Sequence, residues 1–516
     1  METNFDSFRS NEAGGGGGEV GMIGRMYYDG QWCESLDGGT YELTDPATGK
    51  RAGTVYFGGR KDAAAAIDAA ERAFRTWSKV PAAERAIPLY NAYKLILERV
   101  DRIARILTTE QGKPLAEAKG ELTLAAEYLR WYSEEAKRVY GEIIPASSPN
   151  KRLMVIRQPV GVVAAITPWN FPASTITRKI APALAAGCTV VVKPAEATPL
   201  TAIALFEVFH EAGFPPGVVN LVMGEGPVIG AEFLENRKVK KIAFTGSTNV
   251  GKQLLSGAAA QVKRVSLELG GHAPFIVFED ADLELALESC VVSKFRNAGQ
   301  TCICANRIYV QQSIYDIFSE KMARRVASMK IGNGFEPGVE IGPLFNEAAY
   351  NKVREHVDDA PAKGGKLLTG GRLRQINRMS GYFYEPTLIA DANETMKICT
   401  EETFGPVAPI LPFVTEEEVI EKANNSLYGL AAYVFTRDLG RTYRISEALE
   451  YGIVGINDPL PGTAQAPFGG WKESGLGSEG GHYGLEPFLE IKYISMALNE
   501  RPFAPSISIP KDGTIS

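Results

Sequence analysis

The stretch VVAAITPWNFPASTITRKIAPALAAGCTVVVKP, residues 162–194, decides the fold that this chain adopts. The apolar run Val162–Thr167 ends at the turn Pro168–Pro172, which predicts a buried strand. A helix is expected over Thr175–Ala186, and the β-branched run Thr189–Val192 predicts a second strand. Strand, helix and strand in this order predict a parallel βαβ unit, whose ligands bind at the carboxyl ends of the strands.

The same alternation continues on both sides of this stretch, which makes the expected fold class α/β. Downstream we expect the helix Leu200–Ala212, the strands Val218–Val222 and Lys241–Phe244, and, in a second α/β region that begins near Gly270, the strand Phe275–Phe278, the helix Leu283–Phe295 and the strand Arg307–Val310. Upstream, helical spacing predicts helices over Asp62–Trp77, over Ile87–Glu117 with an interruption near Gly112 and Pro114, and over Gly120–Val139.

Length and composition exclude several classes of protein. The chain has 516 residues, too many for one compact core, so two or three domains are expected. A net charge of −6 gives no basic excess and argues against a nucleic-acid partner. No apolar run reaches the roughly 18 residues of a membrane span, so no membrane partner is expected. The N-terminus lacks the apolar core of a signal peptide.

The cysteines and the first residues also carry information. Six cysteines in so long a chain do not form a disulfide framework, which favours a reduced, cytoplasmic protein. Residues 1–24 include five consecutive glycines, Gly14–Gly18, and are predicted to be a disordered tail.

The first candidate for chemistry is Cys302. The helical pattern before it breaks at Gly299, and a cysteine that follows a glycine turn can be presented on a loop where backbone N–H groups favour its thiolate. The alternative is a buried structural cysteine, because free cysteine is among the most buried residue types.

Glu268 is the second candidate, in the segment Leu267–Gly271. A carboxylate between two leucines either caps a neighbouring group or has its pKa raised for use as a general base. The alternative is a solvated surface position, which is where most glutamates lie.

The segment Phe244–Gly251 is the third candidate. A strand runs into Gly246-Ser247 and then into a helix, so the backbone can approach a ligand closely and the helix N-terminus favours a phosphate. The spacing is not that of the usual dinucleotide fingerprint, so the segment is weak evidence when taken alone.

These segments, in this order, resemble the aldehyde dehydrogenase superfamily over Met26–Leu498. The motifs that carry the resemblance are TPWNFP at Thr167–Pro172, KPAE at Lys193–Glu196, FTGSTNVG, ELGG, GQTC, EETFGP at Glu401–Pro406 and APFGG at Ala466–Gly470. Within the superfamily the chain is most similar to the succinate-semialdehyde dehydrogenase branch. The supporting runs are KFRNAGQTCICANRIYVQ at Lys294–Gln311, ITRK at Ile176–Lys179 and ALEYGIVGIN at Ala448–Asn457.

The resemblance implies a mechanism that runs through a thioester. Cys302 would attack the aldehyde carbon as a thiolate. The side-chain amide of Asn170 and the backbone N–H of Cys302 would hold the oxyanion of the thiohemiacetal. After hydride transfer, Glu268 would deprotonate the water that hydrolyses the thioester.

The resemblance also implies the cofactor and the residues that contact it. The matched positions are Thr167, Trp169, Lys193, Glu196, Gly246, Ser247, Glu402 and Phe404. A carboxylate at Glu196 accepts from the ribose hydroxyls and repels a 2′-phosphate, which favours NAD over NADP. Some relatives carry a small residue there and use NADP. Trp169 packs either on the dinucleotide or in the core, and no metal is expected.

For the substrate, Arg178 and Arg296 match the positions that hold the distal carboxylate in the succinate-semialdehyde branch. The alternative for both is a structural ion pair. The loop Asn457–Gln465, with Thr463 matched to a substrate contact, departs from the pattern of the branch. A short semialdehyde is therefore expected, while sulfolactaldehyde, a sugar-derived aldehyde, lactaldehyde and glycolaldehyde stay open.

Two rival functions and a regulatory hypothesis also follow. A thiol esterase could use Cys302 and Glu268 without NAD, and a non-catalytic binding protein could share the fold. Cys304 lies two residues after the nucleophile, and the two cysteines could form a redox switch. The alternative is that Cys304 is a small apolar filler.

The resemblance implies three parts and a homodimer or homotetramer. A Rossmann-like cofactor-binding domain would take residues 25–136 and 160–268, and a catalytic α/β domain residues 269–471. Residues 137–159 and 486–500 would form a small β oligomerisation element. The alternation in Leu489–Leu498 suits a strand that is added to the sheet of a partner subunit.

Overall fold

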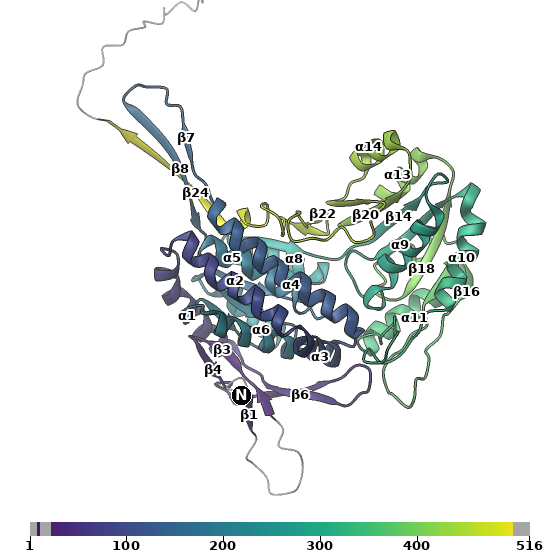
Figure 1. Ribbon diagram of the computed structural model, residues 1–516, viewed down its shortest axis with the longest axis horizontal. Helices are drawn as coiled ribbons and strands as arrows, with labels where there is room; N and C mark the ends of the chain where they lie inside the picture. Colours follow the sequence, from purple (N-terminus) through teal and green to yellow (C-terminus); the bar gives the residue numbers. More distant parts are fainter. Residues whose placement is uncertain (1–7, 11–21, 499–516) are drawn as a thin grey trace, which may run out of the picture.

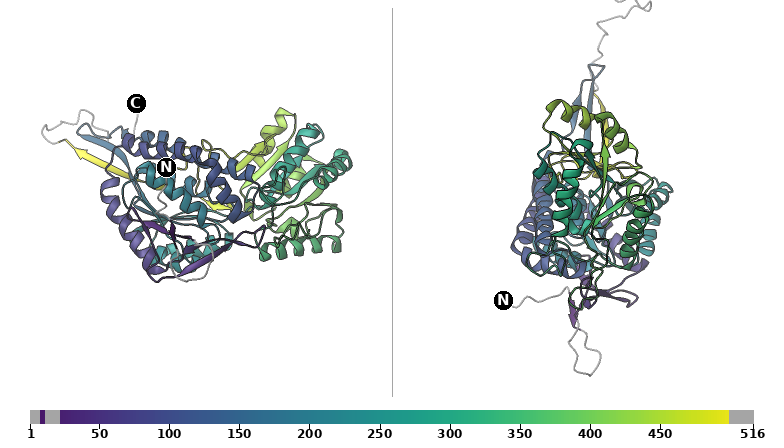
Figure 2. Two further views of the ribbon diagram at one scale, coloured as in Figure 1. Left: turned by 60° about the horizontal axis from the view of Figure 1, so that its bottom comes forward. Right: turned by 90° about the vertical axis from the view of Figure 1, so that its right-hand side faces the viewer.

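A computed structural model describes residues 8–10 and 22–498 of the chain. It contains two α/β bodies and a β arm that projects away from them (Figures 1 and 2). The predicted α/β class is confirmed. No helix in the described part of the chain combines the length and the apolar character needed to cross a membrane.

The first body is built on an eight-stranded sheet. Its strands, in spatial order, are β23 (Gly475–Leu476), β13 (Arg264–Glu268), β12 (Val239–Thr245), β9 (Val162–Ile166), β10 (Thr189–Lys193), β11 (Val219–Leu221), β3 (Met26–Tyr28) and β4 (Gln31–Cys33). The five strands from β13 to β11 are parallel, and the pairings at both edges are antiparallel. β9 and β10 are buried almost throughout, as expected of central strands covered on both faces.

Helices cover this sheet and link its strands (Figure 1). They are α1 (Arg60–Trp77), α2 (Ala82–Glu98), α3 (Val100–Gln111), α4 (Leu115–Glu135) with the short η1 (Ala136–Arg138), α5 (Ser174–Ala186), α6 (Pro199–Ala212), α7 (Gly226–Glu235) and α8 (Thr248–Ala259). The long helical stretch expected over Ile87–Glu117 breaks near Gly112 as predicted, and also at Arg99, where neither glycine nor proline marks the end. Gly112 ends α3 at φ 91°, a conformation that glycine adopts without strain.

The second body is a seven-stranded sheet with its own helices. In spatial order the strands are β16 (Lys366–Thr369), β17 (Thr387–Ala390), β18 (Val407–Phe413), β15 (Ala305–Gln311), β14 (Ala273–Val277), β20 (Ala431–Phe435) and β21 (Ile453–Ile456). The helices are α9 (Leu283–Phe295), η2 (Arg296–Gly299), η3 (Gln312–Ile314), α10 (Tyr315–Ala327), α11 (Glu347–Ala362), α12 (Lys397–Thr400), α13 (Glu416–Asn424) and α14 (Leu439–Ala448). A two-stranded ribbon, β19 (Tyr428–Gly429) with β22 (Trp471–Lys472), lies beside them.

Two smaller sheets complete the molecule. The arm consists of β7 (Glu142–Ile144), β8 (Lys151–Pro159) and β24 (Leu489–Ala497), with β8 in the centre, and the short η4 (Glu486–Phe488) precedes β24. The other sheet joins β1 (Phe8–Ser10), β2 (Met22–Gly24), β6 (Arg51–Tyr56) and β5 (Thr40–Thr44).

The N-terminal sheet corrects the expectation of a wholly disordered tail over residues 1–24. Residues 8–10 and 22–24 pair as antiparallel strands, in which backbone N–H and C=O groups bond to one another whatever the side chains are. The glycine run and the rest of that tail, residues 1–7 and 11–21, lie outside the described residues.

The central strand β12 carries a buried cation. Lys241 is 1% exposed, and its Nζ donates to the Ser266 hydroxyl at 2.6 Å and lies 5.0 Å from the ring centre of Phe488. Burial lowers the pKa of Lys241 to about 7. The unfolded chain holds this proton to about pH 10.5, so between pH 7 and pH 10.5 the unfolded state binds more protons and stability rises with pH.

We therefore expect Lys241→Met to raise the free energy of unfolding by roughly 1–3 kcal/mol near pH 8, because the variant has no proton to release on folding. The difference should shrink as the pH approaches about 10.5, where both states of the parent chain are neutral at this position. Denaturant unfolding of both proteins at several pH values measures it. A loss of stability of equal size at every pH would show that folding does not change the ionisation of this lysine.

Candidate active site

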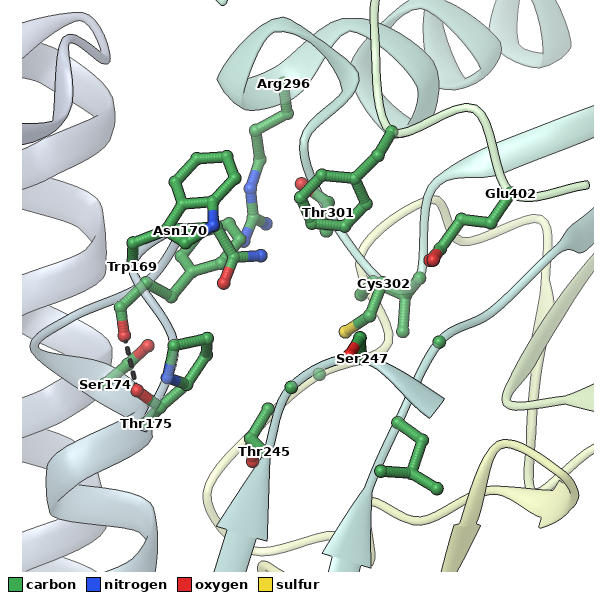
Figure 3. Close-up of a pocket in the computed structure, with 18 of the residues that line it drawn as sticks. Trp169, Asn170, Ser174, Thr175, Thr245, Ser247, Arg296, Thr301, Cys302 and Glu402 are labelled. Carbon is green, nitrogen blue, oxygen red and sulfur yellow. Dashed lines mark hydrogen bonds between the residues drawn. The ribbon is translucent and has the colours of Figure 1, made fainter. Parts of the chain in front are cut away.

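A cavity of about 580 Å³ lies where the two bodies meet (Figure 3). The first body contributes the residues after β9, β12 and β13, so the cavity lies at the carboxyl ends of parallel strands, as predicted. The cavity lining includes Trp169, Asn170, Phe171, Ser174, Arg178, Gly246, Ser247, Leu269, Gly270, Arg296, Cys302, Glu402, Phe404, Leu460, Gly462 and Phe468.

Cys302 follows a backbone segment of unusual conformation. After α9 the chain passes through three residues with positive φ, Asn297 (52°), Ala298 (54°) and Gly299 (72°). A side chain on Gly299 would lie 2.1 Å from the carbonyl oxygen of Gly405, so only glycine allows these two loops to cross. This crossing fixes the loop that carries Cys302 to the cavity wall.

The thiol of Cys302 is half-buried and faces the cavity (Figure 3). Burial raises the pKa of Cys302 to about 12, and the nearby guanidinium of Arg178 opposes this rise. The turn therefore presents the cysteine to a cavity, but it does not produce the thiolate that a glycine turn was expected to favour. Desolvation outweighs the backbone N–H groups here.

Asn170 lies in the turn after β9 and is 6% exposed. Its Nδ2 donates to the carbonyl oxygen of Gln300 at 3.0 Å, which ties the turn to the Cys302 loop. The side-chain amide lines the same cavity as the sulfur of Cys302 (Figure 3). A second N–H of the amide is thus available to an oxygen in the cavity.

Glu268 is the last residue of β13 and is 1% exposed. Neither carboxylate oxygen has a hydrogen-bond partner among the described residues. Burial raises the pKa of Glu268 well above its usual range, the carboxylate of Glu479 adds to the rise, and Arg178 and Lys179 oppose it. The alternative of a solvated surface position is therefore wrong. Leu269 and Gly270, which follow it, line the cavity, whereas Glu268 itself lies behind the lining.

Arg178, Lys179 and Glu479 form a buried ionic group beside Glu268. Arg178 Nε lies 2.5 Å from Glu479, and its guanidinium stacks over Phe468 at 4.1 Å. Lys179 is fully buried, pairs with Glu479 and donates to Thr245 Oγ1. Neither Lys179 nor Glu479 was found from the sequence, because nothing in the local pattern joins residues 300 positions apart. Arg178 lines the cavity but is also a structural ion-pair partner.

Arg296 is the other predicted substrate contact, and it lines the same cavity. Its guanidinium lies 4.9 Å from the ring centre of Phe171. It makes no hydrogen bond or ion pair with any residue that the structure describes. The carboxylate of Glu117 interacts electrostatically with Arg296 from outside ion-pair distance. The guanidinium therefore keeps its N–H donors for an anionic group in the cavity.

Five of the predicted cofactor residues lie at the cavity. Gly246 and Ser247 precede α8, and Ser247 Oγ accepts from the Val250 N–H at 3.4 Å. Glu402 accepts from the Gly271 N–H at 2.9 Å, and burial raises the pKa of Glu402 to about 7.

The aromatic pair among these five, Trp169 and Phe404, also belongs to the cavity wall. Trp169 stacks on Phe345 with 4.1 Å between the ring centres and meets Phe404 edge-on at 5.7 Å. Trp169 thus packs against other aromatic rings and still lines the cavity.

The other three cofactor residues lie beyond the cavity lining. Thr167 is buried, and its Oγ1 has no partner among the described residues. Lys193 and Glu196 pair at 2.8 Å, and the N–H of Gly226, the first residue of α7, donates to Glu196 at 2.6 Å. Although burial opposes it, the Lys193 ammonium lowers the pKa of Glu196, so this carboxylate is anionic.

Two further candidates are not brought to the cavity. Thr463 does not line it, although its neighbours Leu460 and Gly462 do. Cys304 is fully buried, and its thiol donates to the carbonyl oxygen of Lys294 at 3.3 Å. A disulfide with Cys302 would require the side chain of Cys304 to leave this environment, so the redox switch stays a prediction.

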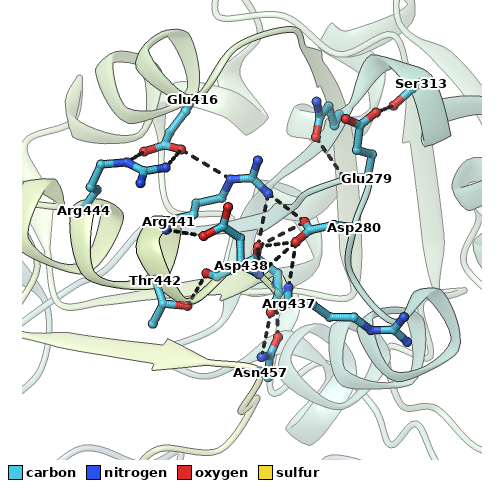
Figure 4. Close-up of polar contacts among 12 residues, drawn as sticks. Glu279, Asp280, Ser313, Glu416, Arg437, Asp438, Arg441, Thr442, Arg444 and Asn457 are labelled. Carbon is cyan, nitrogen blue, oxygen red and sulfur yellow. Dashed lines mark hydrogen bonds and ion pairs between the residues drawn. The ribbon is translucent and has the colours of Figure 1, made fainter.

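The loop over Asn457–Gln465 is held firmly at its base (Figure 4). Asn457, at φ 52°, donates to the Thr436 carbonyl at 3.0 Å and accepts from the Thr436 N–H at 3.2 Å. Asp280 in turn accepts from the Thr436 hydroxyl and from Arg441, at 2.9 and 2.7 Å. Beyond this clamp the loop reaches the cavity with Leu460 and Gly462.

Comparison with known proteins gives a consistent picture. A model described as "Aldehyde dehydrogenase family" matches residues 32–494. The chain is 52% identical over 474 residues to a glutarate-semialdehyde dehydrogenase from Pseudomonas putida, covering 92% of this chain and 98% of the relative. It is 52% identical over 470 residues to a succinate-semialdehyde dehydrogenase [NADP(+)] from Escherichia coli, covering 91% and 97%.

Solved structures agree with the fold described above. A crystal structure of an NADP-dependent enzyme from Escherichia coli superposes with a TM-score of 0.90 at 51% identity, covering 92% of this chain and 98% of that one. The betaine aldehyde dehydrogenase of Staphylococcus aureus in complex with NAD+ superposes with a TM-score of 0.90 at 40% identity, covering 93% and 95%. Both cofactors thus occur among the proteins to which this chain is similar.

The raised pKa of Cys302 predicts how this thiol reacts in the chain without ligands. We expect the rate of its alkylation by iodoacetamide to rise about tenfold per pH unit from pH 7 to pH 9, because the reactive thiolate stays a small fraction in this range. Mass spectrometry of the Cys302 peptide follows the reaction, and Cys302→Ser serves as the control. A plateau below pH 8 would contradict the raised pKa.

Proposed function

The chain belongs to the aldehyde dehydrogenase family, and from this premise we propose that it oxidises a short anionic aldehyde, succinate semialdehyde or a similar semialdehyde, to the carboxylic acid with NAD. The observation that carries the proposal is the placement of Arg296, which forms no ion pair within residues 8–10 and 22–498, in the cavity that Cys302 faces. An aldehyde with a distal carboxylate spans such a pair of groups.

Cys302 is the proposed nucleophile. Its thiolate adds to the aldehyde carbon, a C–S bond forms and the carbonyl electrons move to oxygen. Because burial disfavours the thiolate, the proton must leave to a neighbouring base before attack. The carboxylates of Glu402 and Glu268 both act on the Cys302 thiol, and we propose Glu268, at the end of β13, as this base. The Asn170 amide then donates to the new oxyanion.

Glu268 is also the proposed base for hydrolysis. Burial raises its pKa, which makes it a stronger base toward water once the proton taken from Cys302 has passed to solvent. The hydroxide adds to the thioester carbon, the C–S bond breaks and the acid leaves, which returns the sulfur to Cys302 as a thiolate. The ionic group of Arg178, Lys179 and Glu479 keeps the charge of this buried base compensated.

The residues fit a nicotinamide dinucleotide. The unpartnered hydroxyl of Thr167, the N-terminus of α8 behind Ser247 and the carboxylate of Glu196 are donors and acceptors of the kinds that phosphates and a ribose require. Lys193 and Glu196 would hold the adenosine ribose, and Glu402 the nicotinamide ribose. When bound, the nicotinamide supplies the acceptor for the hydride that leaves the thiohemiacetal carbon.

Glu196 supports NAD over NADP as the preferred cofactor. The Lys193 ammonium compensates one negative charge, and a 2′-phosphate would bring close to two more. The relative from Escherichia coli carries NADP(+) in its name, so the preference rests on this carboxylate of the present chain.

The departure in the loop Asn457–Gln465 keeps other short aldehydes as candidates. Leu460 and Gly462 are the residues of that loop that line the cavity, and Leu460 also lines a small recess together with Arg296. Sulfolactaldehyde shares the anionic tail, whereas lactaldehyde, glycolaldehyde and sugar-derived aldehydes lack it. The rival of another class, a thiol esterase, is not favoured, since the relatives compared are named as dehydrogenases.

We also propose that the three parts expected from the sequence act as cofactor-binding, catalytic and oligomerisation domains. The arm supports a homodimer or homotetramer, because it projects from the body and exposes apolar side chains such as Ile143 (81%) and Ile491 (70%) (Figure 2). β7 and β24 are both edge strands, which can pair with another subunit. Cysteine usage supports a reducing compartment, and we propose the cytoplasm.

The substrate proposal predicts that Arg296→Leu separates anionic from neutral aldehydes. We expect kcat/KM for succinate semialdehyde to fall about 10- to 100-fold, since one charge-assisted contact is lost, while butanal changes less than about threefold. NADH absorbance at 340 nm is the measurement. Arg324→Leu, on the surface of α10, is the matched control.

An equal loss of kcat/KM on both aldehydes in Arg296→Leu would mean that this arginine does not bind the carboxylate of the substrate. The same panel, extended to sulfolactaldehyde, glycolaldehyde, lactaldehyde and a simple ester, distinguishes the rivals. Ester cleavage without cofactor reduction favours the esterase, and silence across the panel favours the binding protein.

The cofactor proposal predicts that Glu196→Ser relaxes the preference for NAD. We expect the ratio of kcat/KM with NAD to that with NADP to fall at least about tenfold, because the variant removes a partly exposed negative charge from the position proposed to face the 2′ oxygen. Steady-state kinetics with both cofactors and one aldehyde measure the ratio. An unchanged ratio would show that another group makes the choice.

A further inference from the structure

The connection between α3 and α4 places four polar side chains behind the cavity. The segment QGKPLAEAKGE, residues 111–121, turns at Gly112 and begins α4 after Pro114. Glu117 and Glu121 are four residues apart on α4 and therefore lie on one face of the helix. Gln111 and Lys113 lie on the turn itself. All four side chains contact either the turn that carries Asn170 or the loop that carries Asn297.

Lys113 is 2% exposed and holds the turn that carries Asn170. Its Nζ donates to the backbone carbonyl of Asn170 at 2.7 Å and to Glu121 at 2.6 Å. The same ammonium lies 3.9 Å from the ring centre of Phe171. The carbonyl of Asn170, the carboxylate of Glu121 and the face of Phe171 thus surround the cation, which leaves little freedom to this part of the turn.

Glu121 extends this contact to the next helix. Its second oxygen accepts from the N–H groups of Ala173 and Ser174 at 2.8 and 3.2 Å, at the start of α5. Glu121 therefore neutralises Lys113 and satisfies donors of the first helical turn, which have no partner within the helix. The turn with Asn170 is held from the side of α4 and at the start of α5.

Asn297 holds the same carbonyl from the opposite loop. Its Nδ2 donates to the backbone carbonyl of Asn170 at 3.1 Å and to that of Gln300 at 3.3 Å. Its Oδ1 accepts from Gln111 at 3.0 Å, and its N–H donates to Glu117 at 2.8 Å. The left-handed backbone at Asn297 directs these groups inward, a conformation that asparagine tolerates better than most residues.

We propose that Lys113 and Asn297 are positioning residues for the oxyanion donor, since both donate to the one backbone carbonyl next to the side chain of Asn170. The Asn170 amide donates one N–H to the carbonyl oxygen of Gln300, which also accepts from Asn297. The direction of the second N–H of Asn170 is thereby fixed. This inference rests on the proposed role of Asn170. A displacement of the donor by about 1 Å can cost about 100-fold in rate.

The test compares two glycine substitutions at neighbouring positions. Asn297→Gly removes the side-chain contacts, and Ala298→Gly is the matched control, because both residues have positive φ and Ala298 has no side-chain polar group. Acylation is followed as kcat/KM for the best aldehyde of the panel. Alkylation of Cys302 by iodoacetamide is followed in parallel, since there the thiolate displaces iodide from a saturated carbon and no oxyanion forms.

We expect Asn297→Gly to lower kcat/KM at least about tenfold and to change the alkylation rate less than about threefold. Ala298→Gly should change both by less than about threefold. A merely structural role for Asn297 would lower both rates together through a displaced Cys302 loop, or would lower only the melting temperature. Either result overturns the proposal, as does an unchanged kcat/KM.

The double variant Lys113→Met with Glu121→Gln tests the other donor without leaving Glu121 as an unpaired buried charge. It should show the same split between acylation and alkylation. If this variant does not fold, Asn297→Gly in an Asn170→Ala background supplies the second measurement. We expect less than about a twofold further loss there, because the donor that Asn297 positions is already absent. A full additional loss would overturn the proposal.

Asn170→Ala alone separates this inference from the proposed function. If it leaves acylation intact, Asn170 is not the oxyanion donor, and the function and the inference fail together. If it lowers acylation about 100-fold or more while Asn297→Gly does not, the proposed function stands and the positioning role is overturned.

Discussion

Two carboxylates and two cations share one buried space behind the cavity, and the balance among their charges is the constraint on which the site depends. Glu268 and Glu479 face Arg178 and Lys179 with almost no solvent to screen them. Removing one member would leave a buried charge uncompensated, which costs several kcal/mol in proteins. Glu268 stays both buried and ionisable only if three segments keep their relative positions. These are the end of β13, the first half of α5 and the segment around Glu479.

Close packing also fixes the other side of the cavity, where the Cys302 loop lies. Cys302 reaches the cavity only because the chain makes three left-handed residues in succession and crosses Gly405 without a side chain. Asn170 is tied to that loop through the carbonyl of Gln300. Nucleophile and amide thus belong to different bodies of the molecule, yet their relative position is set by short contacts between backbone and side-chain groups.

Local patterns predicted much of the fold and the gathering of the main candidates. The strands and the helix within residues 162–194 were predicted to within one or two residues, because apolar periodicity and turns mark them. Cys302, Asn170, Arg178 and Arg296 were predicted from motifs and do line one cavity. The catalytic and binding roles of these residues remain predictions.

What the sequence left open depends on distant partners. The short strands β3 and β4 have no strong alternation, and β3 takes its place by pairing with β11, far along the chain. The pairs Lys179–Glu479 and Lys113–Glu121 look like ordinary charges in the sequence, and only tertiary packing makes them buried ion pairs. For Glu268 and for the Cys302 thiol, burial decides the pKa, and burial is a property of the fold as a whole.

The clamp of Asn457 on Thr436, backed by Asp280 and Arg441, separates two demands on one loop (Figure 4). The base is locked to the sheet, whereas the tip around Leu460 and Gly462 only has to contact whatever enters the cavity. Sequence change at the tip can therefore alter which aldehydes are accepted at little expense to folding. A loop with a fixed base and a variable tip allows the substrate range to change while the catalytic residues stay the same.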